Sequence, residues 1–212
     1  MLRINGGELM CGRFYLDVEF EEILKHYFGI VGDFPVTEYE PKEIFPSNAI
    51  PVIHRGKEVE RTIHLMKWGF APTYMNKIFI NARSETIAEK KMFKEAFFRR
   101  RCLVPASGYY EWQKVPGEDN KIIKVKRQIS VPSKKIISMA GIYDRFVDKV
   151  GKSFWGVSIL TKPSNEHVKE VHDRMPIILT KEMETAWIAQ YDEDYTPLFD
   201  IINKANPEYS IE

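Results

Sequence analysis

The sequence contains few cysteines, almost no net charge and no long apolar run, and each absence excludes a class of protein. Among its 212 residues are two cysteines, Cys11 and Cys102, too few for a disulfide framework and without the Cys-x-x-Cys spacing of a zinc site. No stretch approaches the ~18 apolar residues of a membrane-spanning helix. Residues 1–10 lack the apolar segment of a signal peptide. These absences favour a protein of a reducing compartment with no membrane segment.

Charge is balanced overall but unevenly placed. The chain carries 31 Lys and Arg against 30 Asp and Glu, a net charge of +1, which excludes a polycation that binds nucleic acid through bulk charge. Residues 90–101 and 121–135 are nevertheless rich in Lys and Arg. Each stretch is most simply a solvated face, although the two together could form a local patch for phosphates.

The apolar pattern predicts strands in the middle of the chain and helices around them. With 44% hydrophobic and 13% aromatic residues, the chain can bury a core, which excludes disorder. From residue 102 onward, short alternating runs follow one another at the spacing of an antiparallel meander or barrel. Strands and helices do not alternate regularly, which argues against a parallel sheet. We predict an α+β fold, with an antiparallel, barrel-like β core and flanking helices.

Individual elements are predicted from apolar periodicity, turn residues and capping residues. The predicted helices cover 18–28 (with Asp17 as N-cap and Gly29 as stop), 84–100, a short stretch after Ser164, 181–189 and 197–205. The predicted strands cover 11–16, a hairpin at 49–66, the runs from 102 to 160, and 176–180, whereas 30–47 is predicted to be a loop.

Several short segments concentrate reactive side chains beside Gly, Pro and Trp. They are Cys11-Gly12-Arg13-Phe14, Trp68-Gly69-Phe70, Asn81-Ala82-Arg83-Ser84-Glu85, Gly108-Tyr109-Tyr110-Glu111-Trp112, Ile159 to Asn165, and His172-Asp173-Arg174-Met175-Pro176. Each segment alone has an ordinary structural explanation. Free cysteines are usually buried, Trp68 could simply pack in the core, and each arginine could pair with a carboxylate.

Together and in this order, the segments resemble the motifs of the SRAP family, the SOS response-associated peptidases, also called abasic-site processing proteins. The resemblance runs from Cys11 to about Ala189. It implies one SRAP domain over residues 11–212 of a bacterial cytoplasmic protein that associates with DNA after damage. The implied partner is single-stranded DNA, or a junction between single and double strands, that contains abasic sites. No cofactor, metal or membrane is implied, and we expect a monomer.

The resemblance also implies a covalent reaction and roles for individual residues. In the family, an N-terminal cysteine attacks the aldehyde of a ring-opened abasic sugar and forms a thiazolidine with it. The implied catalytic residues are Cys11, Asn81, Glu111 and His172. Arg13, Arg83, Arg174 and Thr161 would bind phosphates, Trp68 and Trp112 would stack on bases, and Pro46 would act as a wedge. The family often has Asn-x-x-Pro before the first hairpin, where this chain has Glu43-Ile44-Phe45-Pro46.

The position of Cys11 departs from the family pattern, because a cysteine inside a chain has no α-amine. We expect residues 1–10 to be a leader that is absent from the working protein. Residues 6–10 can be back-translated into a ribosome-binding site followed by a start codon, so Met10 could be the true initiator. The alternative is a propeptide that the protein removes itself, with Cys11 as nucleophile.

Other classes of function remain open at this point. Cys11, His172 and Glu111 could form the nucleophile, base and orienting group of a thiol peptidase. The tryptophans and arginines could instead belong to a DNA-binding protein without catalytic activity. A lyase activity at the abasic site could also accompany crosslinking. Cys102 is predicted to be buried and inert, and His54 and His64 have no spacing that indicates a metal site.

Overall fold

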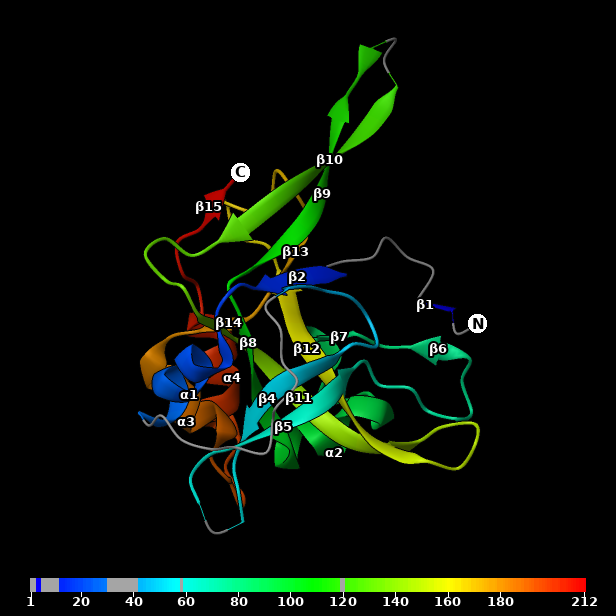
Figure 1. The fold of residues 1–212 in the computed structure, drawn as a ribbon, viewed down its shortest axis with the longest axis vertical. Coiled ribbons are helices and arrows are strands. Elements are labelled where there is room, and N and C mark those ends of the chain that lie inside the picture. The colour runs from blue at the N-terminus through cyan, green and yellow to red at the C-terminus, as the bar shows by residue number, and fades with distance from the viewer. Residues whose placement is uncertain (1–2, 5–11, 30–41, 58, 119–120) are drawn as a thin grey trace.

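A barrel of five strands forms the centre of the structure, a computed structural model that describes residues 3–4, 12–29, 42–57, 59–118 and 121–212 (Figure 1). Its strands are β4 (Ala49–His54), β5 (Thr62–Trp68), β8 (Arg101–Ala106), β11 (Ile137–Val147) and β12 (Ser153–Pro163). Neighbouring strands are antiparallel, except that β12 closes the ring by pairing parallel to β5, where Val157 lies opposite Trp68.

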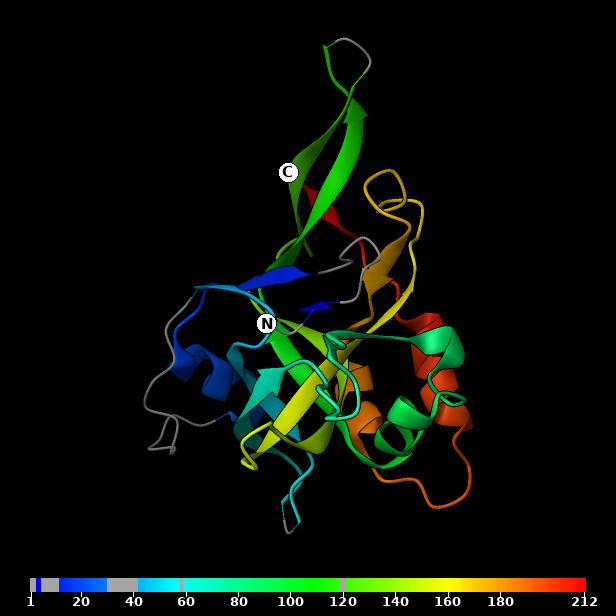
Figure 2. The same ribbon diagram turned by 90° about the vertical axis from the view of Figure 1, so that its right-hand side faces the viewer.

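A second sheet lies beside the barrel and carries a long hairpin. Its order is β15 (Ser210–Ile211), β10 (Ile122–Ser130), β9 (Gly108–Pro116), β2 (Arg13–Leu16) and β3 (Lys42–Ile44). β2 pairs with β9 at residues 108–110, and β15 pairs with β10 at Ile129 and Ser130. Beyond these positions the β9–β10 hairpin projects from the body of the protein in both views (Figures 1 and 2).

Short strands extend the barrel at one end of β12. β7 (Asn81–Arg83) runs parallel to β12, and β13 (Arg174–Pro176) runs antiparallel to it. β14 (Ile178–Leu179) pairs with β11, and β1 (Arg3–Ile4) pairs with β6 (Lys77–Ile78). The long strand β12 is therefore the common neighbour of β5, β7 and β13, which contain Trp68, Asn81, Arg83 and Arg174.

The helices α1 (Phe20–Phe28), α2 (Lys91–Arg99), α3 (Lys181–Ile188) and α4 (Thr196–Lys204) pack around the barrel (Figure 1). Buried cations hold the C-terminal ends of some of them, where carbonyl groups lack helical partners. Arg101 donates to the carbonyl oxygens of Phe97 and Trp187 at 2.8 and 2.7 Å, and Lys162 donates to those of Ile202 and Ala205. Among the described residues, no helix combines the length and apolar character needed to cross a membrane.

A close approach between two backbones requires glycine where the barrel closes. A Cβ atom on Gly156 of β12 would lie 2.7 Å from the carbonyl oxygen of Gly69, which follows β5. Gly69 itself has a φ of +125°, a conformation that other residues rarely adopt, and its N–H donates to the carbonyl of Val157 at 2.7 Å. The backbone geometry at the barrel closure therefore explains why the central residue of the Trp68-Gly69-Phe70 motif is glycine.

The predicted fold class is confirmed, whereas several predicted elements need correction. The strands from residue 101 onward, the stop of α1 at Gly29 and the last two helices agree with the prediction. α1 begins at Phe20 with Glu19 as N-cap, so the prediction of Asp17 is wrong. The helix predicted over 84–100 is split into a 3-10 turn, Ser84–Thr86, and α2. Residues 42–44 form β3 within the predicted loop, and turns rather than a helix follow Ser164.

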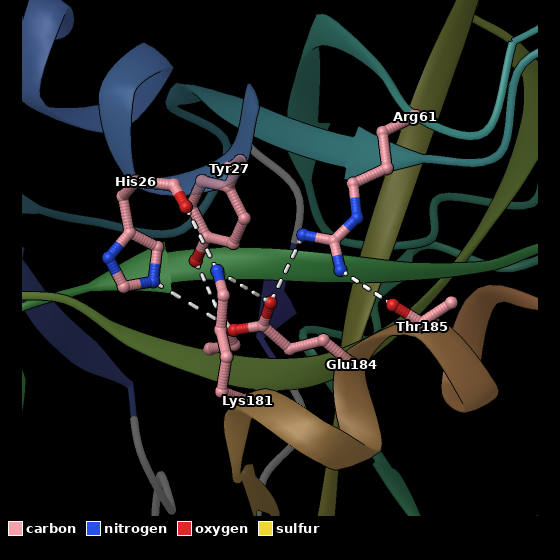
Figure 3. A network of polar contacts seen from close by, with 7 residues as sticks. His26, Tyr27, Arg61, Lys181, Glu184 and Thr185 are labelled. Carbon is pink, nitrogen blue, oxygen red and sulfur yellow. Dashed lines mark hydrogen bonds and ion pairs between the residues drawn. The ribbon is translucent and has the colours of Figure 1, made fainter. Parts of the chain in front are cut away.

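A buried carboxylate, Glu184 of α3, joins helices α1 and α3 to the barrel (Figure 3). It accepts a hydrogen bond from Ser138 of β11 at 2.7 Å and forms ion pairs with Arg61 and Lys181 at 3.1 and 3.2 Å. Lys181 also donates to the carbonyl of His26 in α1. Burial alone raises the pKa of Glu184, but hydrogen bonds from His26 and Ser138 and the charge of Lys181 outweigh it and lower the pKa to about 2.

We expect Glu184→Gln to lower the free energy of unfolding by ~2–4 kcal/mol at pH 7, because the substitution removes a buried carboxylate that pairs with Arg61 and Lys181. The pKa of Glu184 falls from 4.5 in its ordinary state to about 2 in the fold. Its contribution is therefore complete above pH ~5 and is lost as pH falls toward 2, so the difference between the proteins should shrink by roughly half near pH 3. Urea unfolding at both pH values measures this difference. The control is Glu166→Gln, because the Glu166 side chain is 92% exposed; an equal effect of both variants would contradict the assignment.

Candidate active site and nucleic-acid interface

Three predicted site residues, Asn81, Arg83 and Arg174, lie on short strands that meet at one end of β12. Thr161 of β12 pairs with Arg83 of β7 on one side and with Pro176 of β13 on the other. Asn81 begins β7 and Arg174 begins β13, so the Asn-Ala-Arg and His-Asp-Arg-Met-Pro motifs are brought together by a single strand. Their separation in sequence is bridged by the parallel β7–β12 and antiparallel β12–β13 pairings.

A bidentate ion pair connects these motifs. The two terminal nitrogens of Arg174 donate to the two carboxylate oxygens of Glu85, at 2.5 and 2.8 Å. One of them also donates to the carbonyl oxygen of Thr161 at 2.9 Å. The hydrogen bonds from Arg174 lower the pKa of Glu85 to about 2, so this carboxylate is ionised near neutral pH. The pair fastens the segment after β7 to β13.

The same turn holds the ring of His172. Its Nδ1 lies 3.1 Å from the backbone N–H of Arg174, from which it can accept a hydrogen bond, and 2.9 Å from the exposed carboxylate of Asp173, to which it can donate one. Both contacts involve Nδ1 and fix the position of the ring, and the side chain is only 12% exposed.

Arg13 of β2 lies between two aromatic rings at the outer face of the second sheet. Its guanidinium carbon is 4.5 Å from the ring centroid of Phe45 and 5.1 Å from that of Trp112. Glu43 of β3 accepts a hydrogen bond from Arg13 at 3.2 Å and another from Lys126 at 2.9 Å. Burial is the largest single influence and raises the pKa of Glu43, but the hydrogen bonds and charges of Lys126 and Arg13 together outweigh it and lower the pKa overall.

Strand β9 presents opposite environments on its two faces. Tyr109 and Glu111 point inward and are 0% and 1% exposed, whereas Tyr110 and Trp112 lie on the partly exposed outer face. Gln113 donates to the carbonyl of Glu170 at 3.1 Å, so this strand contacts the turn that precedes His172. A Cβ atom on Gly108 would lie 2.5 Å from the hydroxyl of Tyr15, which explains the glycine that begins the motif.

Some predicted DNA contacts do not agree with the structure. Trp68 is 0% exposed, donates from Nε1 to the carbonyl of Ile80 at 3.1 Å, and packs edge-on against Phe14. A ring with no exposed surface cannot stack on a base, so Trp68 has the core role. Thr161 is 0% exposed and Arg174 is 7% exposed with its terminal nitrogens bonded to Glu85. Both are placed to hold the site together rather than to reach a phosphate.

Arg83, Asn81 and Pro46 have surroundings that permit contact with a ligand. Arg83 is exposed, and Asn81 is half-buried beside it. Pro46 lies in a turn beside Trp68, because Ser47 donates to the carbonyl of Trp68 at 2.8 Å. The turn is also held by the side chain of Asn48, which accepts the N–H of Phe45 at 2.9 Å.

Cys11 lies outside the described residues, so its predicted role stays a prediction. The other cysteine, Cys102, is buried as expected, and burial raises the pKa of its thiol well above the ordinary value. Its thiolate is therefore disfavoured, which leaves Cys102 unsuited to nucleophilic attack.

Sequence reasoning missed the functional contributions of Glu85, Glu43 and Phe45. Glu85 stands within the Asn-Ala-Arg-x-Glu segment, so its presence in a motif rich in arginine was the available signal. Its partner Arg174 is far away in sequence and could be identified only from the fold. Glu43 and Phe45 lie in a stretch predicted to be a loop, and nothing in the pattern indicated that they surround Arg13.

The fold and these residues define a class: a barrel whose Asn-Ala-Arg and His-Asp-Arg-Met-Pro motifs meet at one end of β12, beside a second sheet on which Arg13 contacts Trp112. The chain belongs to the family described as SOS response associated peptidase (SRAP), whose model matches residues 10–211. The chain is 35% identical over 195 residues to the abasic site processing protein YoqW of Bacillus subtilis, covering 88% of this chain and 84% of that protein.

Further relatives extend the comparison. The abasic site processing protein YedK of Escherichia coli is 32% identical over 187 residues, which cover 85% of this chain and 80% of that protein. A solved structure from Bacteroides thetaiotaomicron superposes with a TM-score of 0.77 and 26% identity, covering 95% of this chain and 90% of that one. A phage-related protein from Bordetella bronchiseptica shares the fold, with a TM-score of 0.74.

We expect Trp68→Phe to lower the free energy of unfolding by ~1–3 kcal/mol, because it removes buried ring volume and the hydrogen bond to Ile80. Chemical unfolding monitored by circular dichroism measures the loss. Trp155→Phe is the control, since Trp155 is 44% exposed and should change stability by less than ~0.5 kcal/mol. Unchanged stability of Trp68→Phe together with weakened DNA binding would instead support the stacking role.

Proposed function

We propose that this protein processes abasic sites by forming a covalent thiazolidine crosslink between Cys11 and the ring-opened sugar of single-stranded or junction DNA. Its membership of the SRAP family and its similarity to relatives named abasic site processing proteins support this function. The α-amine of an N-terminal Cys11 condenses with the aldehyde and releases water, which gives a Schiff base. The thiol then adds to the same carbon and closes the five-membered ring.

The observation that carries the proposal is the register between β2 and β9. Arg13 lies opposite Tyr110, so the start of β2 is beside the part of β9 that contains Glu111 and Trp112. This register supports the proposed role of Cys11, which precedes Arg13 by two positions in the sequence, because Glu111 is buried on one face of β9 and Trp112 contacts Arg13 on the other.

The described side chains can supply the proton transfers that the reaction requires. Opening the sugar ring needs a proton on the departing ring oxygen, and we assign this donation to His172, whose ring is positioned by the contacts of Nδ1 with Arg174 and Asp173. Glu111 is positioned to take and return protons as the amine attacks and water leaves. Asn81 would hold the amine and the sugar by hydrogen bonds. An α-amine, with an ordinary pKa of ~7.7–8.0, has a useful neutral fraction near pH 7, unlike a lysine.

DNA would be held beside this centre by a small number of side chains. Arg13 and the exposed Arg83 would bind phosphates, Trp112 would stack on a base, and Pro46 would separate neighbouring bases. Local recognition of this kind agrees with a net charge of only +1, because it depends on placed arginines and aromatic rings rather than on bulk charge.

The reaction requires removal of residues 1–10, since the thiazolidine contains the α-amine of Cys11. We propose that translation begins at Met10 and that removal of this methionine exposes Cys11. A self-removed propeptide is the alternative. In the structure, Arg3 and Ile4 of the leader pair with Lys77 and Ile78 of β6, so a retained leader has a place to bind.

We expect protein that starts at Met10 to form an adduct with abasic single-stranded DNA that survives denaturing electrophoresis. The full chain that retains residues 1–10, and Cys11→Ala in the Met10-started protein, should form none because neither has the aminothiol. Mass spectrometry of each protein establishes which residues are present. Efficient crosslinking by a chain that retains its leader would contradict the thiazolidine mechanism.

The same experiment separates the alternative functions. A thiol peptidase would cleave peptides without a free α-amine, and its activity would be lost in Cys11→Ala. A DNA-binding protein without catalysis would bind with unchanged affinity after Cys11→Ser and would form no adduct with any start site. Strand cleavage in the same gel would report an accompanying lyase activity.

We expect Glu111→Gln to slow crosslinking by ~100-fold or more, because an amide cannot exchange protons in the ring-opening and condensation steps. Affinity for DNA with an unreactive abasic analogue should stay unchanged. Single-turnover kinetics with abasic DNA measures the rate, and Glu170→Gln, an exposed change on the neighbouring turn, is the control. Equal rates for Glu111→Gln and the unsubstituted protein would exclude Glu111 as the acid or base.

A further inference from the structure

The projecting part of the β9–β10 hairpin is a two-stranded ribbon formed by residues 112–116 and 122–127. In the described chain, these residues pair only with each other, because β2 reaches only to Tyr110 and β15 pairs only at Ile129 and Ser130. Figures 1 and 2 show the ribbon extending away from the barrel from a root beside β2. Both of its faces are therefore accessible over most of its length.

One face of the ribbon is basic. The register places Lys126 opposite Trp112 and Lys124 opposite Lys114, so these four side chains share a face. Lys114, Lys124 and Lys126 are exposed, and so is Lys121 near the tip. We call the surface formed by Trp112, Lys114, Lys124 and Lys126 the basic face.

The basic face is continuous with the proposed DNA site at the root of the ribbon. Trp112 stacks there with the guanidinium of Arg13, at 5.1 Å. Lys126 lies 3.7 Å from the ring centroid of Tyr110 and bonds Glu43, which also binds Arg13. A nucleic acid that passes over Arg13 and Trp112 in the direction of the ribbon meets Lys126, Lys124 and Lys114 in turn.

The composition of the ribbon favours double-stranded over single-stranded DNA. Proteins that bind single strands stack bases on aromatic side chains, but beyond Trp112 at the root of the ribbon, residues 113–127 contain no Phe, Tyr or Trp. A two-stranded β-ribbon has the dimensions of the major groove of B-DNA. From Lys126 to Ile122 the ribbon extends ~14 Å, which corresponds to ~4 base pairs of duplex.

We propose that the basic face of the ribbon binds the duplex that flanks an abasic site, so that this protein engages the double-stranded side of a junction. The inference rests on the proposed function, since it takes DNA to be the partner. It adds a second contact surface outside the crosslinking centre. Exposed lysines on free strand edges can also simply prevent aggregation, and the experiment has to distinguish these roles.

The test substitutes Lys114, Lys121 and Lys124 together with Gln and measures DNA binding as a function of salt. The probe is a junction of duplex and single strand that carries a tetrahydrofuran abasic analogue, which has no aldehyde and cannot be crosslinked. We expect the slope of log K against log salt to fall in magnitude by about 2–3, since each lost duplex contact removes ~0.9. Binding to the single strand alone should be unchanged.

Two matched proteins control this measurement. Lys57→Gln, Lys149→Gln and Lys152→Gln together remove the same charge from exposed turns at the opposite end of the molecule, and should leave the slope unchanged. Substitution of Lys114, Lys121 and Lys124 with Arg keeps the charge and should keep the slope. Circular dichroism and gel filtration establish that each variant is folded and monodisperse.

The outcomes judge the proposal directly. Unchanged slopes, or aggregation of the Gln variant with DNA binding intact, would overturn it and assign the lysines to edge protection. An equal loss with single-stranded DNA would overturn the duplex assignment. Crosslinking to a true abasic site at saturating DNA should match the unsubstituted protein. If the unsubstituted protein forms no crosslink, the proposed reaction fails, while the salt slopes still decide whether the ribbon binds duplex.

Discussion

The closure of the barrel at β12 is the constraint on which the rest of the structure depends. This strand pairs with β11 on one edge and with β5 and β7 on the other, and its far end also pairs with β13. The parallel contact with β5 is possible because Gly156 and Gly69 let two backbones meet where side chains would collide. Every motif of the candidate site except those on β2 and β9 is attached to this strand. The closure of the barrel therefore fixes the positions of these motifs relative to one another.

Individual arginines have different tasks in this architecture. Arg101 is buried and caps helices, Arg174 is buried and holds two strands together through Glu85, and Arg13 lies between aromatic rings at the surface. Each task follows from the element on which the residue lies rather than from its immediate neighbours in sequence. Counting basic residues therefore overstates the surface that can meet DNA, and the carboxylate partners decide which cations remain at that surface.

The sequence was sufficient for the fold class and for most strands after residue 101, because alternation and turn residues record local burial. The prediction from sequence was wrong where pairing between distant segments determines the secondary structure. β3 forms since β2 offers it an edge, and the predicted helix over 84–100 is interrupted where the segment after β7 turns toward Arg174. For the site, motif order located the strands correctly, but burial of Trp68 and Thr161 could not be read from the motifs, which identify important positions without indicating which way a side chain points.

The ion pair between Arg13 and Glu43 determines how an anion can bind to this surface. A carboxylate already occupies the position that an incoming phosphate would take, and Lys126 shares it. Anion binding there is an exchange of partners rather than a simple addition. The carboxylate of Glu43 lowers the net attraction of this surface for polyanions in general. The rings of Phe45 and Trp112 keep the guanidinium of Arg13 oriented during the exchange. Under the proposed function, contact with ordinary DNA would therefore be brief, and only a strand that also offers a reactive sugar would be retained.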